Sequence, residues 1–251
     1  MEDAFELDVY MPLSFKTTEE QEYIQFLWEA FESNCEQGKY QFAFIAYHML
    51  TMSFMYFSIW RIKQNEQSDF QKATIGFAGR DLDGLVHKDD SDDEKRWSVS
   101  PFNFSKANER SIIRILALIG CDKSKIGRYI QLVDQRNDTA HSNGKIHFSD
   151  QGALDNRIRE ILRVVDEIQT HTRPIIERCY KKFLLESHDP EDREYPDDRD
   201  QIREILFRRN YFSHKDIDVC LAYDLAPLAA HAHYSNIEAL HKALMTLRDE
   251  D

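Results

Sequence analysis

The sequence predicts an all-α protein, built as a helical bundle with an additional helical segment at its C-terminal end. Glycine and proline are scarce, with 8 and 6 copies in 251 residues, and apolar residues recur mostly every three or four positions, which is the helical period. Few segments alternate polar with apolar residues as a half-buried strand does. A chain of this length can bury a sizeable core without cross-links.

Charge and cysteine usage limit the functional classes. The formal net charge is −13, which argues against whole-surface binding of nucleic acid, because such binding needs basic patches that displace counterions. Any RNA contact therefore has to be local. The four cysteines form no CxxC pair, and the acidic N-terminus does not resemble a secretory leader. Reduced thiols in a cytoplasmic protein are the simplest interpretation.

The chain is predicted to begin with two antiparallel helices. Thr17 to Glu20 has capping-box spacing and starts a helix over 18–36, which Gly38 ends. A helix over 40–64 follows at once, so the two helices are neighbours. Residues 41–60 carry no Lys, Arg, Asp or Glu and could span a bilayer as a helix. The polar residues among them favour a buried central helix instead, with no membrane contact.

The middle of the chain combines helices with one long loop. Residues 68–78 add a helical turn or two, and 80–104 lose periodicity and form an acidic loop. Its acidic run over 89–94 lacks the central Gly and distal Glu of a calcium loop, so we expect it to be solvated. A helix over 112–119 ends at Gly120, and the next helix begins at Ser124.

The last part of the chain is predicted to hold one long helix and a separate segment. After an extended stretch over 145–148, a helix runs from Ser149 to about Leu185, kinked or interrupted at Pro174. Residues 186–196 form an acidic, proline-containing linker. This linker separates a bundle over 1–185 from a C-terminal helical segment over 197–251 that packs on the bundle. Within that segment, Asp197 or Asp198 caps one helix, Ser213 caps another, and the last helix covers 235–247.

The helix that begins at Ser124 carries three polar residues near its end: Arg136, Asn137 and His141. The apolar stripe of this helix is formed by Ile126, Ile130 and Val133. At about 100° per residue, Asn137 continues this stripe, and Arg136 and His141 lie about 140° apart on either side. A partner surface laid over Asn137 would touch both. Ser142-Asn143-Gly144 then ends the helix with a left-handed cap.

Arg136-Asn137-x3-His141 resembles the R-x4-6-H signature of the HEPN superfamily, in which a polar residue follows the arginine. The resemblance covers the short motif and its helical setting, over about 39–185. It implies a helical bundle that acts as a metal-independent endoribonuclease, with two copies of the motif forming one cleft in a homodimer. It also implies that Arg136 and His141 are catalytic, that Asn137 supports them, and that the protein serves as a toxin or phage-defence effector, restrained by an antitoxin or another regulatory protein.

These residue types suit RNA cleavage without a cofactor. RNA supplies its own nucleophile, the 2′-OH, so cleavage needs a proton acceptor, a proton donor for the 5′ oxygen, and a cation beside the phosphate. A histidine, with an ordinary pKa of ~6.5, can accept or donate that proton, and an arginine can pair two phosphoryl oxygens. The C-terminal helix dipole favours a protonated His141 and therefore the acid role. The family's products are a 2′,3′-cyclic phosphate and a 5′-hydroxyl.

Arg209, Asn210 and His214 repeat the same spacing in the region after the linker. They form a possible second half-site, which would let one chain hold a composite site, as two HEPN modules do in RNA-guided RNA-cutting CRISPR effectors. Alternatively, Arg209 pairs with an acidic neighbour, and His214 is an ordinary first-turn residue of a helix.

Other interpretations stay open beside the nuclease. Many helical domains of this family are inactive, so the alternative function is a non-catalytic dimerisation or interaction module. His231, His233 and His241 could ligate a metal, but no Cys or carboxylate completes the set, so no metal is expected. Three arginines could line a local cleft or form surface salt bridges: Arg157, Arg159 and Arg163. The sequence also lacks a Gly-rich phosphate loop and a Gly-x-Ser-x-Gly elbow.

Overall fold

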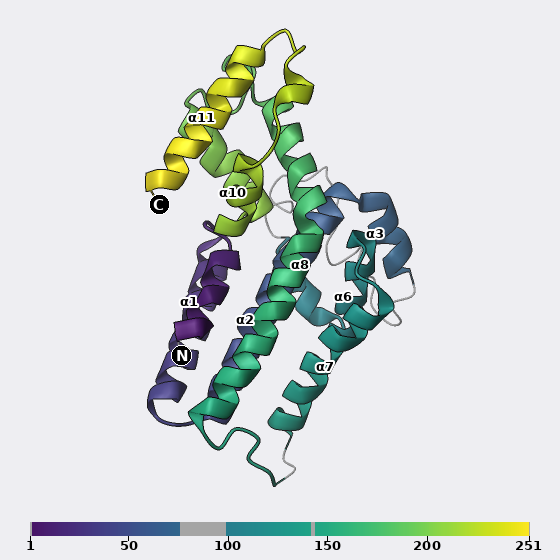
Figure 1. The fold of residues 1–251 in the computed structure, drawn as a ribbon, viewed down its shortest axis with the longest axis vertical. Coiled ribbons are helices and arrows are strands. Elements are labelled where there is room, and N and C mark those ends of the chain that lie inside the picture. Colours follow the sequence, from purple (N-terminus) through teal and green to yellow (C-terminus); the bar gives the residue numbers. More distant parts are fainter. Residues whose placement is uncertain (1, 76–98, 142–143, 251) are drawn as a thin grey trace. The chain divides into compact units, whose positions relative to one another are not determined.

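The protein is all-α, as the sequence predicts (Figure 1). The computed structural model describes residues 2–75, 99–141 and 144–250, and these ranges contain no β-strand, only an isolated bridge between Pro12 and Ser213. The chain forms two compact units, which are described one at a time. The first comprises Met1–Asp8 and Thr17–His171, and the second comprises Val9–Lys16 and Thr172–Asp251.

Helical segments supply the regular structure of both units. The first unit contains η1 (Glu2–Tyr10, whose last two residues belong to the second unit), α1 (Thr18–Glu36), α2 (Tyr40–Asn65), α3 (Gln67–Thr74), η2 (Pro101–Lys106), α6 (Glu109–Arg114), η3 (Ile115–Ile119), α7 (Lys123–Ala140) and the first part of α8 (Gln151–Glu186). The second unit contains the rest of α8, α9 (Asp198–Gln201), the π-helix η4 (Ile202–Arg208), α10 (His214–Leu221), η5 (Ala226–Leu228) and α11 (Tyr234–Glu250).

Helix α2 is the central helix of the first unit. Every side chain from Leu50 to Lys63 is buried, and α1, α3, η2 and α7 all pack against α2. This helix is long and apolar enough to cross a membrane, but 83% of its most apolar window is buried inside the protein. A core helix of a soluble protein has this character, so the predicted buried central helix is confirmed.

Helix α1 begins and ends at the predicted residues. The Thr17 hydroxyl accepts a hydrogen bond from the backbone N–H of Glu20 at 3.3 Å, which satisfies one of the free donors of the first turn. Gly38 follows the last turn with a φ of 69°, a conformation that glycine adopts without strain. This short connection places α1 and α2 side by side and antiparallel (Figure 1).

The segment before α7 is less regular than predicted. The expected helix over 112–119 is divided into α6 and the tighter 3-10 helix η3, and Gly120 ends it with a φ of 82°. Helix α7 begins at Lys123, capped by Asp122, one residue before the predicted start. The acidic run over 89–94 lies outside the described residues.

Of the two predicted effects of Pro174, a kink or an interruption, the interruption is wrong, because helix α8 runs continuously through this residue. A proline inside a helix removes one backbone hydrogen bond and costs about 3 kcal/mol. Apolar side chains on both sides of it are buried, among them Ile168, Ile175 and Ile176, and their burial offsets that cost. Asp150 caps the helix through a 2.9 Å hydrogen bond from the N–H of Ala153.

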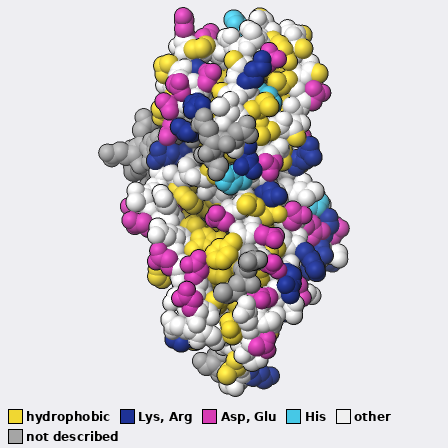
Figure 2. Space-filling model, turned by 60° about the vertical axis from the view of Figure 1, so that its left-hand side comes forward, with side chains coloured by type: hydrophobic (Ala, Val, Ile, Leu, Met, Phe, Trp, Pro, Cys, Tyr) yellow, Lys and Arg dark blue, Asp and Glu magenta, His cyan; other side chains and the backbone are white. Residues whose placement is uncertain are grey.

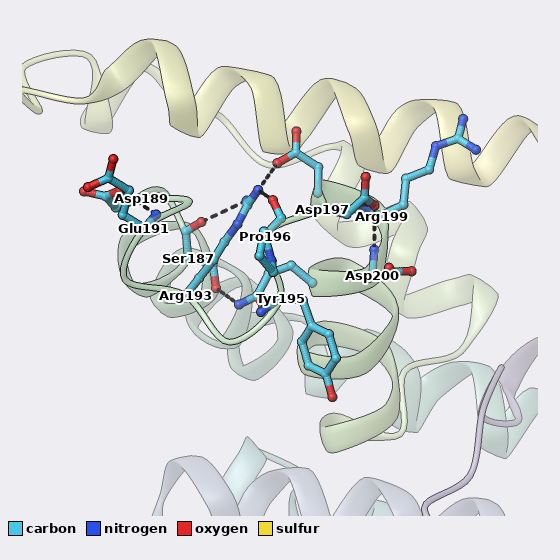
Figure 3. A network of polar contacts seen from close by, with 11 residues as sticks. Ser187, Asp189, Glu191, Arg193, Tyr195, Pro196, Asp197, Arg199 and Asp200 are labelled. Atoms are coloured by element: carbon cyan, nitrogen blue, oxygen red, sulfur yellow. Dashed lines mark hydrogen bonds and ion pairs between the residues drawn. The ribbon is translucent and has the colours of Figure 1, made fainter.

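The predicted linker over 186–196 is an ordered turn within the second unit (Figure 3). The Arg193 side chain is 3% exposed and donates hydrogen bonds to the carbonyl oxygens of Ser187 and Pro196. It also forms an ion pair with Asp198 at 2.6 Å. Gln201 donates to the Ser187 hydroxyl at 2.7 Å and accepts from the N–H of Tyr195. The boundary between the two compact units lies earlier, between His171 and Thr172 inside α8.

An N-terminal segment over 9–16 completes the second unit. The N–H of Leu13 donates to the carbonyl oxygen of Phe212 at 2.9 Å. Arg208 donates to the carbonyl oxygens of Phe15 and Lys16 at 3.0 and 3.1 Å. Residues near the two ends of the sequence are therefore bound together within this unit, which the sequence pattern did not indicate.

Candidate functional site

The buried face of α7 leads directly to Arg136. Tyr129, Leu132 and Val133 are buried, whereas the predicted stripe residues Ile126 and Ile130 are only partly buried. Arg136 lies seven, four and three positions after the three buried residues, so it continues their face of the helix. The predicted position of Asn137 in line with the buried stripe is therefore wrong by one residue, because Tyr129 was not counted as part of the stripe.

Three helices of the first unit meet at the Glu109 carboxylate. Glu109 is the first residue of α6, and its Oε2 accepts a hydrogen bond from the Nη2 of Arg136 on α7. The same oxygen lies 3.6 Å from the Nε2 of His48 on α2, which is longer than a hydrogen bond. The side chains of Arg136 and Glu109 are 26% and 22% exposed, and that of His48 is 2% exposed. Of these three residues, only Arg136 was predicted from the sequence as a site residue.

The charges of this cluster are fixed by its burial and its contacts. Burial alone would raise the pKa of Glu109, but the contacts with His48 and Arg136 outweigh burial and lower the pKa to about 2. Burial lowers the pKa of His48, because the charged imidazolium is poorly solvated there, although Glu109 opposes this effect. Near neutral pH the cluster is therefore an anionic carboxylate between a cationic guanidinium and a neutral imidazole.

Asn137 and His141 occupy the end of the same helix and are not joined to this cluster by a polar contact. His141 follows the last residue of α7, and its N–H donates to the carbonyl oxygen of Asn137 at 3.0 Å. His141 is exposed and Asn137 is half-buried. Within the described ranges, neither side chain takes part in a hydrogen bond or an ion pair. Both are therefore available to a ligand or to a partner.

The end of α7 differs from the predicted cap. His141 has an extended backbone, with φ −77° and ψ 145°, so it leaves the helical path directly after Ala140. Gly144 does have a positive φ, of 74°, but it lies beyond this point, and residues 142–143 lie outside the described residues. The predicted left-handed cap is therefore not seen at the residue that ends the helix.

Exposed apolar side chains accompany the end of α7. Gln41 donates to the carbonyl oxygen of Thr139 at 3.1 Å and accepts from the N–H of His147 at 2.9 Å, which ties the start of α2 to both sides of the motif. Phe42 and Ile146, which neighbour these residues in sequence, are 59% and 78% exposed. Figure 2 shows, separately, one face of the molecule on which hydrophobic side chains are exposed among acidic ones; it does not identify the residues named above.

In the second Arg-Asn-x3-His stretch, Arg209 and Asn210 use their polar groups within the second unit, whereas the Nδ1 of His214 is buried without a hydrogen-bond partner among the described residues. Arg209 forms an ion pair with Glu194 at 2.5 Å, and both side chains are exposed. The amide nitrogen of Asn210 donates to the carbonyl oxygens of Ile205 and Leu206, each at 3.0 Å, which closes the end of η4. His214 is the first residue of α10, as expected for an ordinary first-turn residue.

Backbone geometry supports this structural use of residues 209–214. Tyr211 is fully buried and has a φ of 54°, which is uncommon for a residue other than glycine. Ser213 caps α10 in a complete capping box with Asp216, and both are fully buried. The turn between Asn210 and His214 is therefore specified by packing and capping.

The arginines and histidines that were predicted as further candidate site residues form separate contacts. Arg157 pairs with Glu160, and Arg159 pairs with Asp3, so two of the three proposed cleft arginines form salt bridges. Arg163 has no ion pair among the described residues. His231 and His233 lie near His188, with ring centroids 4.9 and 5.0 Å from its ring. His241 instead forms a 2.7 Å hydrogen bond with Tyr180.

These histidines of the second unit make local hydrogen bonds. Among the residues that the structure describes, no group of three or more His, Cys, Asp or Glu side chains is arranged to hold a metal ion. The Nδ1 of His188 faces the carbonyl oxygen of Leu185 at 2.9 Å, and the Nδ1 of His231 accepts from the N–H of His233 at 3.2 Å. These bonds orient the rings within the second unit.

Comparison with known proteins adds no assignment: no family model matches the chain, and neither the curated proteins nor the solved structures contain a match. The functional argument therefore depends on the chain itself. Glu109 and His48 are the site residues that sequence reasoning missed. A single histidine in the uncharged stretch over 41–60 was the only signal for His48, and nothing in the sequence connects Glu109 to Arg136.

Proposed function

We propose that the protein is a metal-independent endoribonuclease of the HEPN type, which cleaves RNA by attack of its 2′-OH. One observation carries the proposal: Arg136, Asn137 and His141 lie together at the end of α7, and only one of these three side chains forms a polar contact among the described residues. Arg136 is fixed by Glu109, and the side chains of Asn137 and His141 have no polar partner in the described residues. In the second stretch, which has the same spacing, the asparagine is used by the fold: Asn210 donates to the carbonyl oxygens of Ile205 and Leu206.

The proposed chemistry assigns one task to each residue. His141 transfers the proton, either from the 2′-OH or to the departing 5′ oxygen, which contributes roughly 10²–10⁴-fold to the rate. Arg136 pairs with the phosphoryl oxygens and stabilises the negative charge that develops on them. Asn137 orients the substrate or the other two residues. The products are a 2′,3′-cyclic phosphate and a 5′-hydroxyl, and no cofactor enters the reaction.

We further propose that the active form is a homodimer that joins two copies of the α7 end. The exposed apolar residues beside the motif support this assembly: Phe42 and Met49 lie one heptad apart on the same face of α2, at 59% and 38% exposure. A Phe42→Ser variant should run as a monomer in size-exclusion chromatography with light scattering. A dimer of unchanged stability would exclude this interface.

The cellular setting proposed here comes from the family resemblance alone. A cytoplasmic toxin or phage-defence effector needs restraint, so an antitoxin or regulatory protein is the proposed partner beside the RNA substrate. The net charge of −13 confines productive RNA binding to a small region around the motif, because the rest of the surface repels a polyanion.

The test is RNA cleavage by purified protein in the presence of EDTA. Wild type should produce fragments that end in a 2′,3′-cyclic phosphate, and Arg136→Ala and His141→Ala should each abolish them. Loss of wild-type cleavage in EDTA would exclude the metal-independent mechanism. Full activity in either variant would exclude the assigned residues.

The second candidate function is a non-catalytic dimerisation or interaction module. The ion pair between Arg136 and Glu109 favours it, because a partly buried ion pair of this kind also serves purely to join helices. If wild type dimerises but neither binds nor cuts RNA, and Arg136→Ala weakens the dimer, this second function replaces the first.

A further inference from the structure

We propose that Glu109 is the positioning residue of the site: its carboxylate sets the orientation in which the Arg136 guanidinium meets a phosphate. This inference rests on the nuclease function proposed above and extends it to a residue outside the Arg-Asn-x3-His stretch.

Glu109 is fixed by its place at the start of α6. The Asn108 side chain caps this helix by accepting from the N–H of Arg110 at 2.9 Å, and an acidic residue in the first turn is favoured by the helix dipole. A second ion pair, between Arg110 and Asp134, joins the same end of α6 to α7. The helix end that carries the carboxylate is therefore fixed by two contacts, the Asn108 cap and the ion pair of Arg110.

The contact with Glu109 orients Arg136 without using all of its donors. A guanidinium carries five N–H donors in one rigid plane. Its Nη2 donates to Glu109, while its Nε is buried and has no hydrogen-bond partner among the described residues. One charged hydrogen bond at this end restricts rotation of the plane, and because the buried Nε is out of a ligand's reach, the Nη1 donors are the ones left for phosphoryl oxygens. An arginine that is held in advance does not have to be ordered during the reaction.

Glu109 does not serve as the proton acceptor of the reaction. Its contacts hold its pKa at about 2, so the carboxylate is a very weak base near neutral pH. His48 lies beside the Glu109 carboxylate, 3.6 Å from its Oε2. Because burial lowers the pKa of His48, the imidazole does not compete with Arg136 as a second cation. The Glu109 carboxylate therefore has one cationic partner in this cluster, the Arg136 guanidinium. Glu109 therefore orients the Arg136 guanidinium, and the buried His48 side chain packs beside Glu109.

The first experiment is chemical rescue with guanidinium ion. RNA cleavage is measured for Arg136→Ala and for the double variant Arg136→Ala/Glu109→Gln, with guanidinium chloride added at non-denaturing concentrations. Glu109 should hold the free guanidinium in place of Arg136, so we expect rescue of the single variant and at least about tenfold weaker rescue of the double variant. Equal rescue of both variants overturns the positioning role.

The second experiment uses the intact Arg136. Glu109→Gln removes the charge and keeps the shape, and it should lower kcat about 100-fold through misplacement of the guanidinium. The matched control is Glu177→Gln, which removes the carboxylate of an exposed ion pair with Arg173 and should leave kcat unchanged. An unchanged kcat in Glu109→Gln, with a normal thermal unfolding curve, overturns the proposal.

A third measurement does not depend on nuclease activity. In protein with 15N-labelled arginine, NMR should show slow rotation of the Arg136 guanidinium in wild type and fast rotation in Glu109→Gln. Fast rotation in wild type overturns the positioning role by itself. Slow rotation in a wild-type protein that cuts no RNA means that the proposed nuclease function has failed, while the contact between Glu109 and Arg136 stands.

Discussion

Arg136 and Arg209 both precede an asparagine, both lie five residues before a histidine, and both form one ion pair with a glutamate. Their partners differ in environment. Glu109, which holds Arg136, is 22% exposed and lies beside a buried histidine, whereas Glu194, which holds Arg209, is 52% exposed. The asparagines differ as well, since Asn210 closes the end of η4 and Asn137 makes no side-chain hydrogen bond among the described residues.

This difference teaches that the spacing of such a motif does not determine its use. Residues 209–214 stabilise the second unit. Asn210 caps the end of η4, Tyr211 adopts a positive φ in the turn, and Ser213 caps α10 in a capping box. Residues 136–141 keep their functional groups at a helix end, supported by a charge cluster from two other helices. The following predictions test that contrast, in order of decreasing effect on the free energy of unfolding.

The largest expected effect is an acid-dependent loss of stability from Glu109. Its folded-state pKa is lowered from 4.5 to about 2, so its stabilising contribution is complete above the unfolded value and is lost as the pH falls through this window. Between pH 6 and pH 3, urea denaturation should show that the stability advantage of wild type over Glu109→Gln shrinks by about 2 kcal/mol. A constant difference across this range would contradict the proposed charge cluster.

A smaller effect distinguishes the helix caps of the two stretches. The Ser213 hydroxyl accepts from the N–H of Asp216 at 3.2 Å and donates to its carboxylate at 2.9 Å, so Ser213→Ala should lower the free energy of unfolding by about 1 kcal/mol. His141→Ala should change it by less than about 0.5 kcal/mol, because His141 ends α7 through its backbone alone. Equal losses in thermal denaturation would remove this contrast.

The smallest effect is expected at Arg209. Its ion pair with Glu194 is exposed on both sides, with 43% and 52% exposure, and exposed pairs contribute at most about 0.5–1 kcal/mol. Arg209→Ala should therefore unfold within about 0.5 kcal/mol of wild type in urea. A much larger loss would show that Arg209 is coupled to the rest of the second unit.

Much of the helical framework follows from local rules. The N-terminal caps at Thr17, Asp197 and Ser213 and the burial of α2 could all be predicted, because capping and periodicity act over a few residues. The π-helix η4 and the continuous path of α8 through Pro174 could not be predicted. Both depend on packing that compensates for unfavourable backbone geometry.

The candidate site was predictable only along one helix. The spacing of Arg136, Asn137 and His141 is a local pattern, and it placed all three at the end of α7. The contact of Arg136 with Glu109 joins residues 27 positions apart in sequence, and that of Glu109 with His48 joins residues 61 positions apart; no local rule brings those helices together. The one-residue error in the buried face of α7 hid this cluster, because it directed Asn137 instead of Arg136 towards the core.

The central claim is that the stretch ending at His141 is functional and the stretch ending at His214 is structural. The most direct test compares His141→Ala with His214→Ala for RNA cleavage in EDTA, at equal concentrations of folded protein. We expect His141→Ala to lose at least about 100-fold in rate and His214→Ala to cleave at the wild-type rate. Full activity in His141→Ala, or loss of activity in a folded His214→Ala, would contradict the account.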